Sequence, residues 1–265
     1  MEGFHAETLR PGVIQITDNM GVCMTLLAGS EKALLIDTGY GLSSVREEVD
    51  ELIGADKPRR LLLTHGHHDH ILGADEFGSD GVWMFPEDIP VCSIYSGIEQ
   101  RRRVLDSARA RGIPLGLQWQ QHYLSFPMPG TVPPPEETDL GGMEVRILKI
   151  PGHTPGSAVV LANGETLITG DDWNWTTWLF FPESLPVREY RENMRKLLAL
   201  PFRWVICSHQ QGVFPREALE AFVNGLTDEA LAHAQPCPEG DERGIVTRCV
   251  EPAPGQRLVF DGAKL

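Results

Sequence analysis

The segment THGHHDH contains four side chains of the kinds that bind metal ions: His65, His67, Asp69 and His70. It directly follows the apolar run Leu61–Leu63, which predicts a buried strand that ends at Thr64. Side chains of an extended chain alternate between two sides, so His65 and His67 point the same way and can share one metal. Where the chain then turns, Asp69 and His70 can reach a second metal position, while His68 points elsewhere. Gly66 has no side chain, which lets the loop pass close to the metals.

Three further candidate ligands stand at the ends of other apolar runs: His153 in ILKIPGHTPGS, Asp171 in TLITGDDW and His209 in WVICSHQQG. A histidine-rich surface loop without metal would account for one pair of histidines. It does not account for four separate strand ends that each finish with a His or an Asp. All these ligands are nitrogen or oxygen donors, which suit Zn²⁺ and also admit Fe or Mn. We therefore expect two metal ions, with Zn²⁺ as the default.

These motifs, in this order, resemble the metallo-β-lactamase superfamily, and the likeness covers nearly the whole chain. The matching features are HxHxDH, a later Gly-His-Thr-Pro-Gly, a Gly-Asp after a strand and a final His. The resemblance implies an α/β fold built as a four-layer αββα sandwich. It also implies three sets of ligands: His65, His67 and His153 on the first metal, Asp69, His70 and His209 on the second, and Asp171 bridging the two. Asp37 in ALLIDTG resembles an aspartate of the family that orients a ligand, although a strand-end turn explains it equally well.

The sequence departs from the family pattern at two places. Asp171 is followed by Asp172, so either carboxylate could bridge the metals; we favour Asp171 because it comes directly after Thr169-Gly170, as in the family. His209 is followed by Gln210-Gln211 rather than the usual glycine, which changes the rim near the second metal. The remaining histidines at positions 5, 122 and 233 have no such setting, and we expect them to be structural or exposed.

The expected reaction is hydrolysis. Two metal ions can share a water molecule, lower its pKa towards about 7 and so supply hydroxide, while one ion also polarises the oxygen of the group under attack. Asp69 can orient this nucleophile or accept its proton. The sequence therefore predicts a metal-dependent hydrolase acting on a small ester, lactone or thioester.

Other activities of the superfamily remain as alternatives. True β-lactamases carry a cysteine or no ligand where Asp171 stands, so that activity is a minor alternative. Lactonases and glyoxalase II share the complete ligand set, but glyoxalase II has a longer helical C-terminal region that binds glutathione, and here the chain after His209 is short. A persulfide dioxygenase-like iron enzyme stays open, because its ligands His65, His153 and Asp171 are present. Phosphodiesterases and RNA-processing enzymes share the ligands too.

Charge and composition favour a small-molecule substrate. The net charge of -14 repels polyanions, which argues against nucleic acid as a partner. The basic residues of Arg101–Arg111 alternate with apolar ones and indicate the solvated face of an amphipathic helix. No apolar run approaches the roughly 20 residues of a membrane span, and the N-terminus lacks the features of a secretory signal, so we expect no membrane contact and a cytoplasmic protein. Five scattered cysteines suit reduced thiols, although a Cys237–Cys249 link stays open, as does the oligomeric state.

The pattern of apolar runs and turn residues predicts which elements position the ligands. Strands are expected over Val13–Ile16, Val22–Leu27, Ala33–Ile36, Leu61–Leu63, Val82–Phe85, Val145–Ile150, Ala158–Thr169 and Trp204–Cys207. Helices are expected over 45–53 with a Ser44/Glu47 capping box, and over Gly97–Gly112, Val187–Leu200, Arg216–Leu226 and Asp228–Ala234. Prolines in Gln118–Pro135 predict a long loop or cover. We expect one domain over residues 1–265, with an insertion at about 86–135 that covers the active site.

Two aromatic segments are candidates for binding the substrate. Directly after Asp171, the sequence DWNWTTWLFF is expected to place aromatic side chains beside the metals, and at least two of them to pack in the core instead: Trp173, Trp175, Trp178, Phe180 and Phe181. The insertion contributes Tyr95, Trp119 and Tyr123, which could line the same opening to the active site. Among all these, we expect Trp173, Trp175, Trp178, Tyr95 and Trp119 to contact the substrate.

Overall fold

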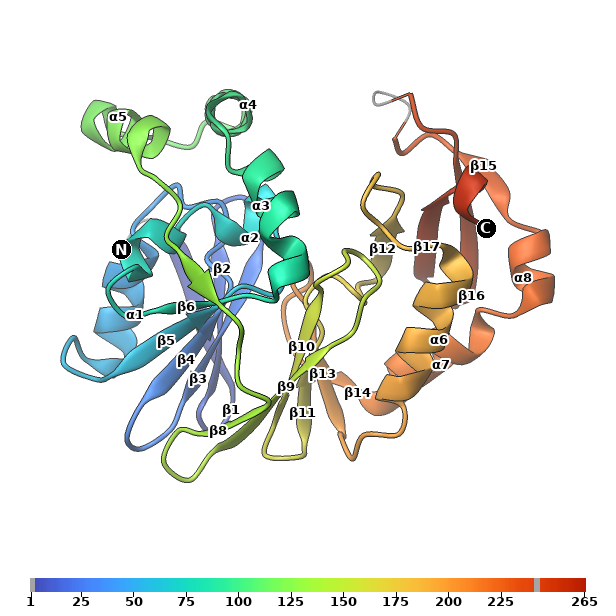
Figure 1. The fold of residues 1–265 in the computed structure, drawn as a ribbon, viewed down its shortest axis with the longest axis horizontal. Helices are drawn as coiled ribbons and strands as arrows, with labels where there is room; N and C mark the ends of the chain where they lie inside the picture. The colour runs from blue at the N-terminus through green and yellow to red at the C-terminus, as the bar shows by residue number, and fades with distance from the viewer. Residues whose placement is uncertain (1–2, 241–243) are drawn as a thin grey trace. The chain divides into compact units, whose positions relative to one another are not determined.

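The computed structural model describes residues 3–240 and 244–265, which divide into two compact units, Met1–Ile147 and Leu148–Leu265 (Figure 1). Each unit has mixed β-structure, helices and a hydrophobic core of its own. The chain passes from the first unit to the second within strand β9, Glu144–Lys149, which pairs in the first unit with β8, Glu137–Asp139. Each unit therefore positions the candidate metal ligands that belong to it.

The first unit is built on a sheet of seven strands in sequential order: β1 Phe4–Arg10, β2 Val13–Asp18, β3 Cys23–Ala28, β4 Ala33–Ile36, β5 Arg59–Leu62, β6 Val82–Trp83 and β7 Thr131–Val132. The strands β1 to β4 are antiparallel neighbours, and β4 to β7 run parallel. The predicted strands β2 to β5 are confirmed, because their apolar side chains are buried in the core. The strand β1 went unpredicted because polar residues alternate along it, and β6 ends at Trp83, before the expected Phe85.

Among the helices of the first unit, α1 Val45–Ile53 and α4 Ile98–Ala110 were expected. The others are α2 His68–Ile71, α3 Ile89–Tyr95 and α5 Leu117–Ser125, with short 3₁₀ turns at Ala74–Phe77 and Pro86–Asp88. Ser44 caps α1, since its Oγ accepts a hydrogen bond from the backbone N–H of Glu47 at 3.1 Å. The same hydroxyl donates to Glu76 at 2.6 Å, which ties the start of α1 to the turn after α2.

Two expectations for residues 86–135 are corrected. The segment Gln118–Pro135 was expected to be a long loop or cover, but its first part is helical, because α5 forms before the prolines begin at Pro127. Arg101 does not belong to the solvated face of its helix, because it is buried and donates to the carbonyl oxygen of Tyr123 at 3.1 Å. Its guanidinium lies 3.8 Å from the ring centroid of Phe126, and burial lowers its pKa. Arg101 therefore joins α4 to α5.

The second unit contains two groups of strands. The first is β10 Ala158–Ala162, β11 Thr166–Ile168, β13 Trp204–Ile206 and β14 Phe214–Pro215, in which β11 and β13 run parallel. The second is a separate sheet in the order β12 Thr176–Leu179, β17 Gln256–Asp261, β16 Thr247–Ala253 and β15 Gln235–Cys237. The expected helices are α6 Val187–Leu197, α7 Arg216–Gly225 and α8 Asp228–Ala232, and a 3₁₀ turn at Gly262–Lys264 ends the chain. The second sheet was not predicted, and it includes part of the aromatic segment after Asp171.

The aromatic residues after Asp171 divide between core and surface. Trp173 has no exposed surface, its Nε1 donates to Gln256 at 2.9 Å, and its ring lies 5.9 Å from that of Phe214. The expectation that Trp173 contacts the substrate is therefore wrong, because this side chain fills the core of the second unit. By contrast, 43% of the surface of Trp178 is exposed.

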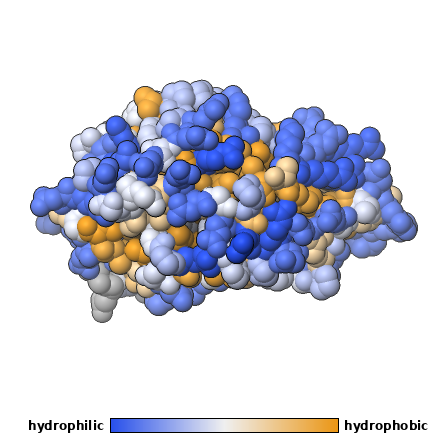
Figure 2. All heavy atoms as spheres, turned by 90° about the horizontal axis from the view of Figure 1, so that it is seen from below, coloured by the Kyte–Doolittle hydropathy of each residue, from blue (hydrophilic) through white to orange (hydrophobic). Residues whose placement is uncertain are grey.

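The surface offers other exposed apolar side chains, among them Ile94, Leu117 and Val246, and Figure 2 shows hydrophobic areas on one face. Among the described residues, no helix has the length and the apolar character needed to span a membrane. All five cysteines are free thiols, so Cys237 and Cys249 are not linked although they lie on the neighbouring strands β15 and β16.

The burial of Trp173 gives the first prediction. Trp173→Ala should lower the free energy of unfolding by about 3–5 kcal/mol, because it opens a large cavity and leaves Gln256 without its indole partner. Denaturant titration followed by circular dichroism measures this loss. Trp178→Ala is the matched control and should cost much less. Equal losses in the two variants would contradict the assignment of Trp173 to the core.

Candidate metal centre

The HxHxDH loop of the first unit gathers its four candidate ligands at the end of β5. His65, His67 and His70 are buried, and Asp69 lies in the first turn of α2 with 15% of its side chain exposed. The ligand atoms of His65 lie within 4.8 Å of those of His67 and of His70, and Asp69 lies equally close to His70. Four nitrogen or oxygen donors therefore meet in one small volume of the first unit.

Asp37 controls the orientation of two of these histidines. Its Oδ2 lies 2.8 Å from Nδ1 of His70 and also accepts from the hydroxyl of Thr64 at 2.8 Å, while its Oδ1 accepts from the backbone N–H of Thr64 at 2.7 Å. Because the Thr64 hydroxyl donates to Asp37, it is an acceptor for Nδ1 of His65, 3.0 Å away. Both imidazoles thus carry their proton on Nδ1, which leaves Nε2 as the coordinating nitrogen.

The backbone of Asp37 has a φ of 65°, in the left-handed region. Aspartate tolerates this region better than most residues, and the three hydrogen bonds of the carboxylate hold it there. The carboxylate therefore faces Thr64 and His70 directly after β4 ends.

Sequence reasoning missed Asp88, whose side chain binds the backbone of the HxHxDH loop. Asp88 is fully buried, and its Oδ2 accepts from the backbone N–H of Gly66 at 2.7 Å. A Cβ on Gly66 would lie 2.4 Å from the backbone nitrogen of Cys92, so the glycine permits close packing against α3. No motif marks Asp88 in the sequence, since only the fold brings it to Gly66.

Two aromatic side chains and a thiol flank the loop. The ring of Tyr95 lies 4.6 Å from that of His67 and 6.0 Å from that of His68, which also contacts Tyr40 at 5.5 Å. Tyr95 is 8% exposed and therefore largely buried beside these histidines. Burial, with a contribution from the Asp88 carboxylate, raises the pKa of the Cys92 thiol to about 11, so Cys92 is protonated at neutral pH.

The second unit gathers its three candidate ligands around the carboxylate of Asp171. Asp171 follows β11 and His209 follows β13, and these strands run parallel, so their carboxyl ends lie at the same edge. The Oδ2 of Asp171 lies 3.6 Å from Nε2 of His153 and 3.1 Å from Nε2 of His209. One carboxylate oxygen therefore faces both imidazoles.

The neighbouring Asp172 has a different role. It is buried, and its Oδ1 accepts from the backbone N–H of His153 at 2.9 Å. Its backbone carbonyl accepts from the hydroxyl of Tyr190 at 2.6 Å, and burial raises the pKa of that hydroxyl, with a further contribution from the Asp172 carboxylate. Nδ1 of His153 lies 2.6 Å from the carbonyl oxygen of Trp178, so Nδ1 carries the proton here too and Nε2 faces Asp171.

Comparison with known families agrees with this donor chemistry. A model of the metallo-beta-lactamase superfamily matches residues 18–209, a range that contains every candidate ligand of both units. The chain belongs to the metallo-β-lactamase superfamily. Members of this superfamily are mostly hydrolytic metalloenzymes that bind divalent metals, and the His/Asp clusters provide suitable donors. The comparison with curated proteins found no match.

Solved structures of metallo-β-lactamase proteins share the fold. A family protein from Thermus thermophilus has a TM-score of 0.56 and 18% identity, over 96% of this chain and 100% of its own. A β-lactamase domain protein from Burkholderia ambifaria has a TM-score of 0.60 and 20% identity, over 87% and 77% of the two chains. A third protein, solved in a di-iron-bound form, has a TM-score of 0.52 and 22% identity, over 83% and 98%. At these identities the likeness shows the fold alone, and it confirms the predicted α/β metallo-β-lactamase fold.

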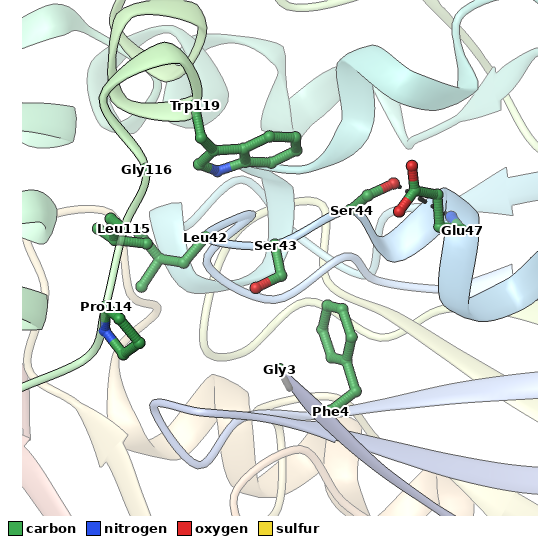
Figure 3. A pocket seen from close by; sticks show the side chains of 10 residues that line it. All are labelled: Gly3, Phe4, Leu42, Ser43, Ser44, Glu47, Pro114, Leu115, Gly116 and Trp119. Atoms are coloured by element: carbon green, nitrogen blue, oxygen red, sulfur yellow. Dashed lines mark hydrogen bonds between the residues drawn. The ribbon is translucent and has the colours of Figure 1, made fainter. Parts of the chain in front are cut away.

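The remaining predicted residues lie in different settings. Trp119 lines a cavity of about 350 Å³ in the first unit, together with residues such as Phe4, Leu42 and Ser43, and its lining includes none of the candidate ligands (Figure 3). In the second unit, the backbone N–H of Trp175 donates to Gln210 at 2.9 Å. His5, His122 and His233 are exposed, and Nε2 of His122 lies 3.0 Å from Oδ2 of Asp75.

The hydrogen bond between Asp37 and His70 gives the second prediction. In Asp37→Asn, an amide NH₂ replaces the Oδ2 that accepts from Nδ1 of His70, so the imidazole proton should move to Nε2 and block metal binding. Loss of such an outer partner typically weakens metal affinity about 10- to 100-fold. Zn²⁺ titration against a competing chelator measures the change. Asp56→Asn, at an exposed position, is the control, and unchanged Zn²⁺ affinity in Asp37→Asn would refute this role.

Proposed function

We propose that the chain is a dinuclear metal-dependent hydrolase in which the candidate ligands of both clusters would hold the metals. In this proposal the first metal takes His65, His67 and His153, the second takes Asp69, His70 and His209, and Asp171 bridges them. The observation that carries it is the tautomer control of His65, His70 and His153, whose Nδ1 atoms all face acceptors and whose Nε2 atoms face other candidate ligands.

The donor set fits a borderline divalent ion. Imidazole nitrogens and carboxylate oxygens suit Zn²⁺, which we take as the default, and also Fe or Mn. The di-iron form of one structural relative keeps iron in consideration. Such ions, when bound, lower the pKa of water and polarise a carbonyl oxygen. The protein then has to orient the substrate and move a proton.

Asp69 is our candidate for the proton-handling residue. Its carboxylate belongs to the ligand cluster, with Oδ2 3.7 Å from Nε2 of His70, yet it is the most exposed of the four side chains in that loop. A carboxylate in this position can accept a proton from an incoming nucleophile or hold it in line with the substrate.

The apolar surface beside His153 supports a small, partly apolar substrate. Trp178 is exposed and packs against Phe180 and Phe181 with ring centroids 5.3 and 6.3 Å apart, and Phe181 contacts His153 at 5.3 Å. Burial of apolar surface contributes about 25 cal/mol per Å², enough to hold an acyl or aryl group without charge.

The charge distribution disfavours nucleic acid. The net charge is -14, and two of the exposed arginines of α4 are paired within their own helix. Nη1 of Arg102 lies 2.7 Å from Oε1 of Glu99, and Nη1 of Arg109 lies 2.8 Å from Oδ1 of Asp106. These cations are therefore partly neutralised and offer little to a phosphate backbone, whose binding depends on many free Lys and Arg contacts.

The metal content tests the centre itself. Protein purified without chelator should contain close to two transition-metal ions per chain. Asp171→Ala should lose one of them and nearly all turnover, because it removes the oxygen that faces both imidazoles. Asp172→Asn should retain both, since its amide oxygen can still accept from His153. Elemental analysis of the wild type and of both variants measures the metal content. At most one metal ion per chain in the reconstituted wild type would count against the dinuclear centre.

A substrate panel tests the reaction. Metal-loaded protein should hydrolyse at least one apolar ester, lactone or thioester faster than phosphodiesters, β-lactams and single-stranded RNA. Trp178→Ala should raise the KM for the best substrate by about tenfold, as expected for roughly 1.4 kcal/mol of lost apolar burial, with metal content unchanged. Oxygen uptake with a thiol persulfide, without hydrolysis of any panel member, would instead indicate an iron dioxygenase.

A further inference from the structure

Asn174 contacts both Asp171 and His209 through one amide group. Its Nδ2 donates to Oδ1 of Asp171 at 3.2 Å, and its Oδ1 accepts from the backbone N–H of His209 at 3.1 Å. The side chain is buried, with 2% of the residue exposed. A single side chain thus links the two strand ends that carry candidate ligands of the second unit.

The orientation of this amide is fixed by chemistry. A backbone N–H can only donate, so the amide atom that faces His209 has to be the oxygen, and the NH₂ group faces Asp171. The backbone of Asn174 is held as well, because its N–H donates to the hydroxyl of Thr177 at 3.0 Å and its carbonyl accepts from that hydroxyl at 3.0 Å. Thr177 is fully buried in β12, so the amide is anchored on the second sheet.

Gln210 makes the reciprocal contact, from the loop of His209 to the loop of Asn174. Its Oε1 accepts from the backbone N–H of Trp175 at 2.9 Å and from the thiol of Cys207 at 3.3 Å. Each loop therefore sends one amide side chain to the backbone of the other. This gives a role to the glutamine that stands where the family usually has glycine.

We propose that Asn174 is a positioning residue that selects the oxygen with which Asp171 bridges the metals. This rests on the proposed dinuclear function. Asn174 occupies Oδ1, and Oδ2 is the oxygen that faces His153 and His209, at 3.6 and 3.1 Å. The same amide accepts from the backbone N–H of His209, whose side chain is 33% exposed, and so helps to fix that backbone. Without Asn174, the carboxylate can rotate and His209 can move, so the second metal should bind more weakly.

Asn174→Asp is the sharpest test. The new carboxylate still accepts from His209, but it turns a donor into an oxygen that repels Oδ1 of Asp171. Asn174→Ala removes both contacts without adding charge. Gln211→Glu is the matched control, because it adds the same charge at an exposed position in the His209 loop.

The readout is the pair of Zn²⁺ dissociation constants, obtained by chelator competition, together with the absorption spectrum of the Co²⁺-substituted protein. Asn174→Asp and Asn174→Ala should each weaken the second Zn²⁺ by at least about tenfold relative to the first and change the Co²⁺ bands, whereas Gln211→Glu should not. A merely structural role would lower stability without changing the ratio of the two constants. An unchanged ratio in both variants would therefore overturn the proposal while leaving the dinuclear function intact. A wild-type protein that binds fewer than two Zn²⁺ ions would overturn both.

Discussion

A neutral imidazole presents Nε2 to a metal when its proton sits on Nδ1, and an acceptor beside a buried Nδ1 fixes that tautomer. Asp37 is this acceptor for His70, the Thr64 hydroxyl for His65 and the carbonyl oxygen of Trp178 for His153. Each acceptor is itself held by the fold: Asp37 at the end of β4, Thr64 directly after β5, and Trp178 within β12. These three candidate ligands therefore belong to a hydrogen-bond network that determines which ring nitrogen carries the proton.

The geometry of the strands explains why the candidate ligands stand at strand ends. A strand fixes the backbone up to its last residue, and the turn that follows frees the side chains to converge. Parallel neighbours bring such ends to one edge, as β4 and β5 do for Asp37 and the histidine loop, and β11 and β13 do for Asp171 and His209. Asp172 shows how closely position decides role, because one residue further along the chain a carboxylate binds the backbone of His153 instead of facing the imidazoles.

The aromatic segment after Asp171 is divided by the strand that it forms. In β12 alternate side chains point to opposite sides, so Thr177 and Leu179 are buried while Trp178 is exposed. Trp173 precedes the strand and belongs to the core, where Gln256 of β17 satisfies its indole N–H. In the function proposed here, Trp178 therefore offers the apolar surface near His153, and its own carbonyl orients that histidine.

The sequence alone predicted most strands and helices, because these depend on short-range periodicity. Its His/Asp motifs predicted the α/β class only through their resemblance to the metallo-β-lactamase superfamily. The family pattern favoured Asp171 over Asp172, but the hydrogen bond that Asp172 accepts from the backbone of His153 is visible only in the fold. The tertiary structure decided the rest. Asp88 reaches Gly66 and Asn174 reaches His209 across long stretches of chain, and no local pattern marks an aspartate or an asparagine for such contacts. The sequence pattern placed Arg101 on a solvated face, whereas in the fold it is buried and bonded to α5. The C-terminal sheet went unpredicted, although β17 contains the apolar run Leu258–Phe260. Local sequence specifies which elements form and which residues can do chemistry, whereas the partners that hold those residues in place come from packing between distant segments.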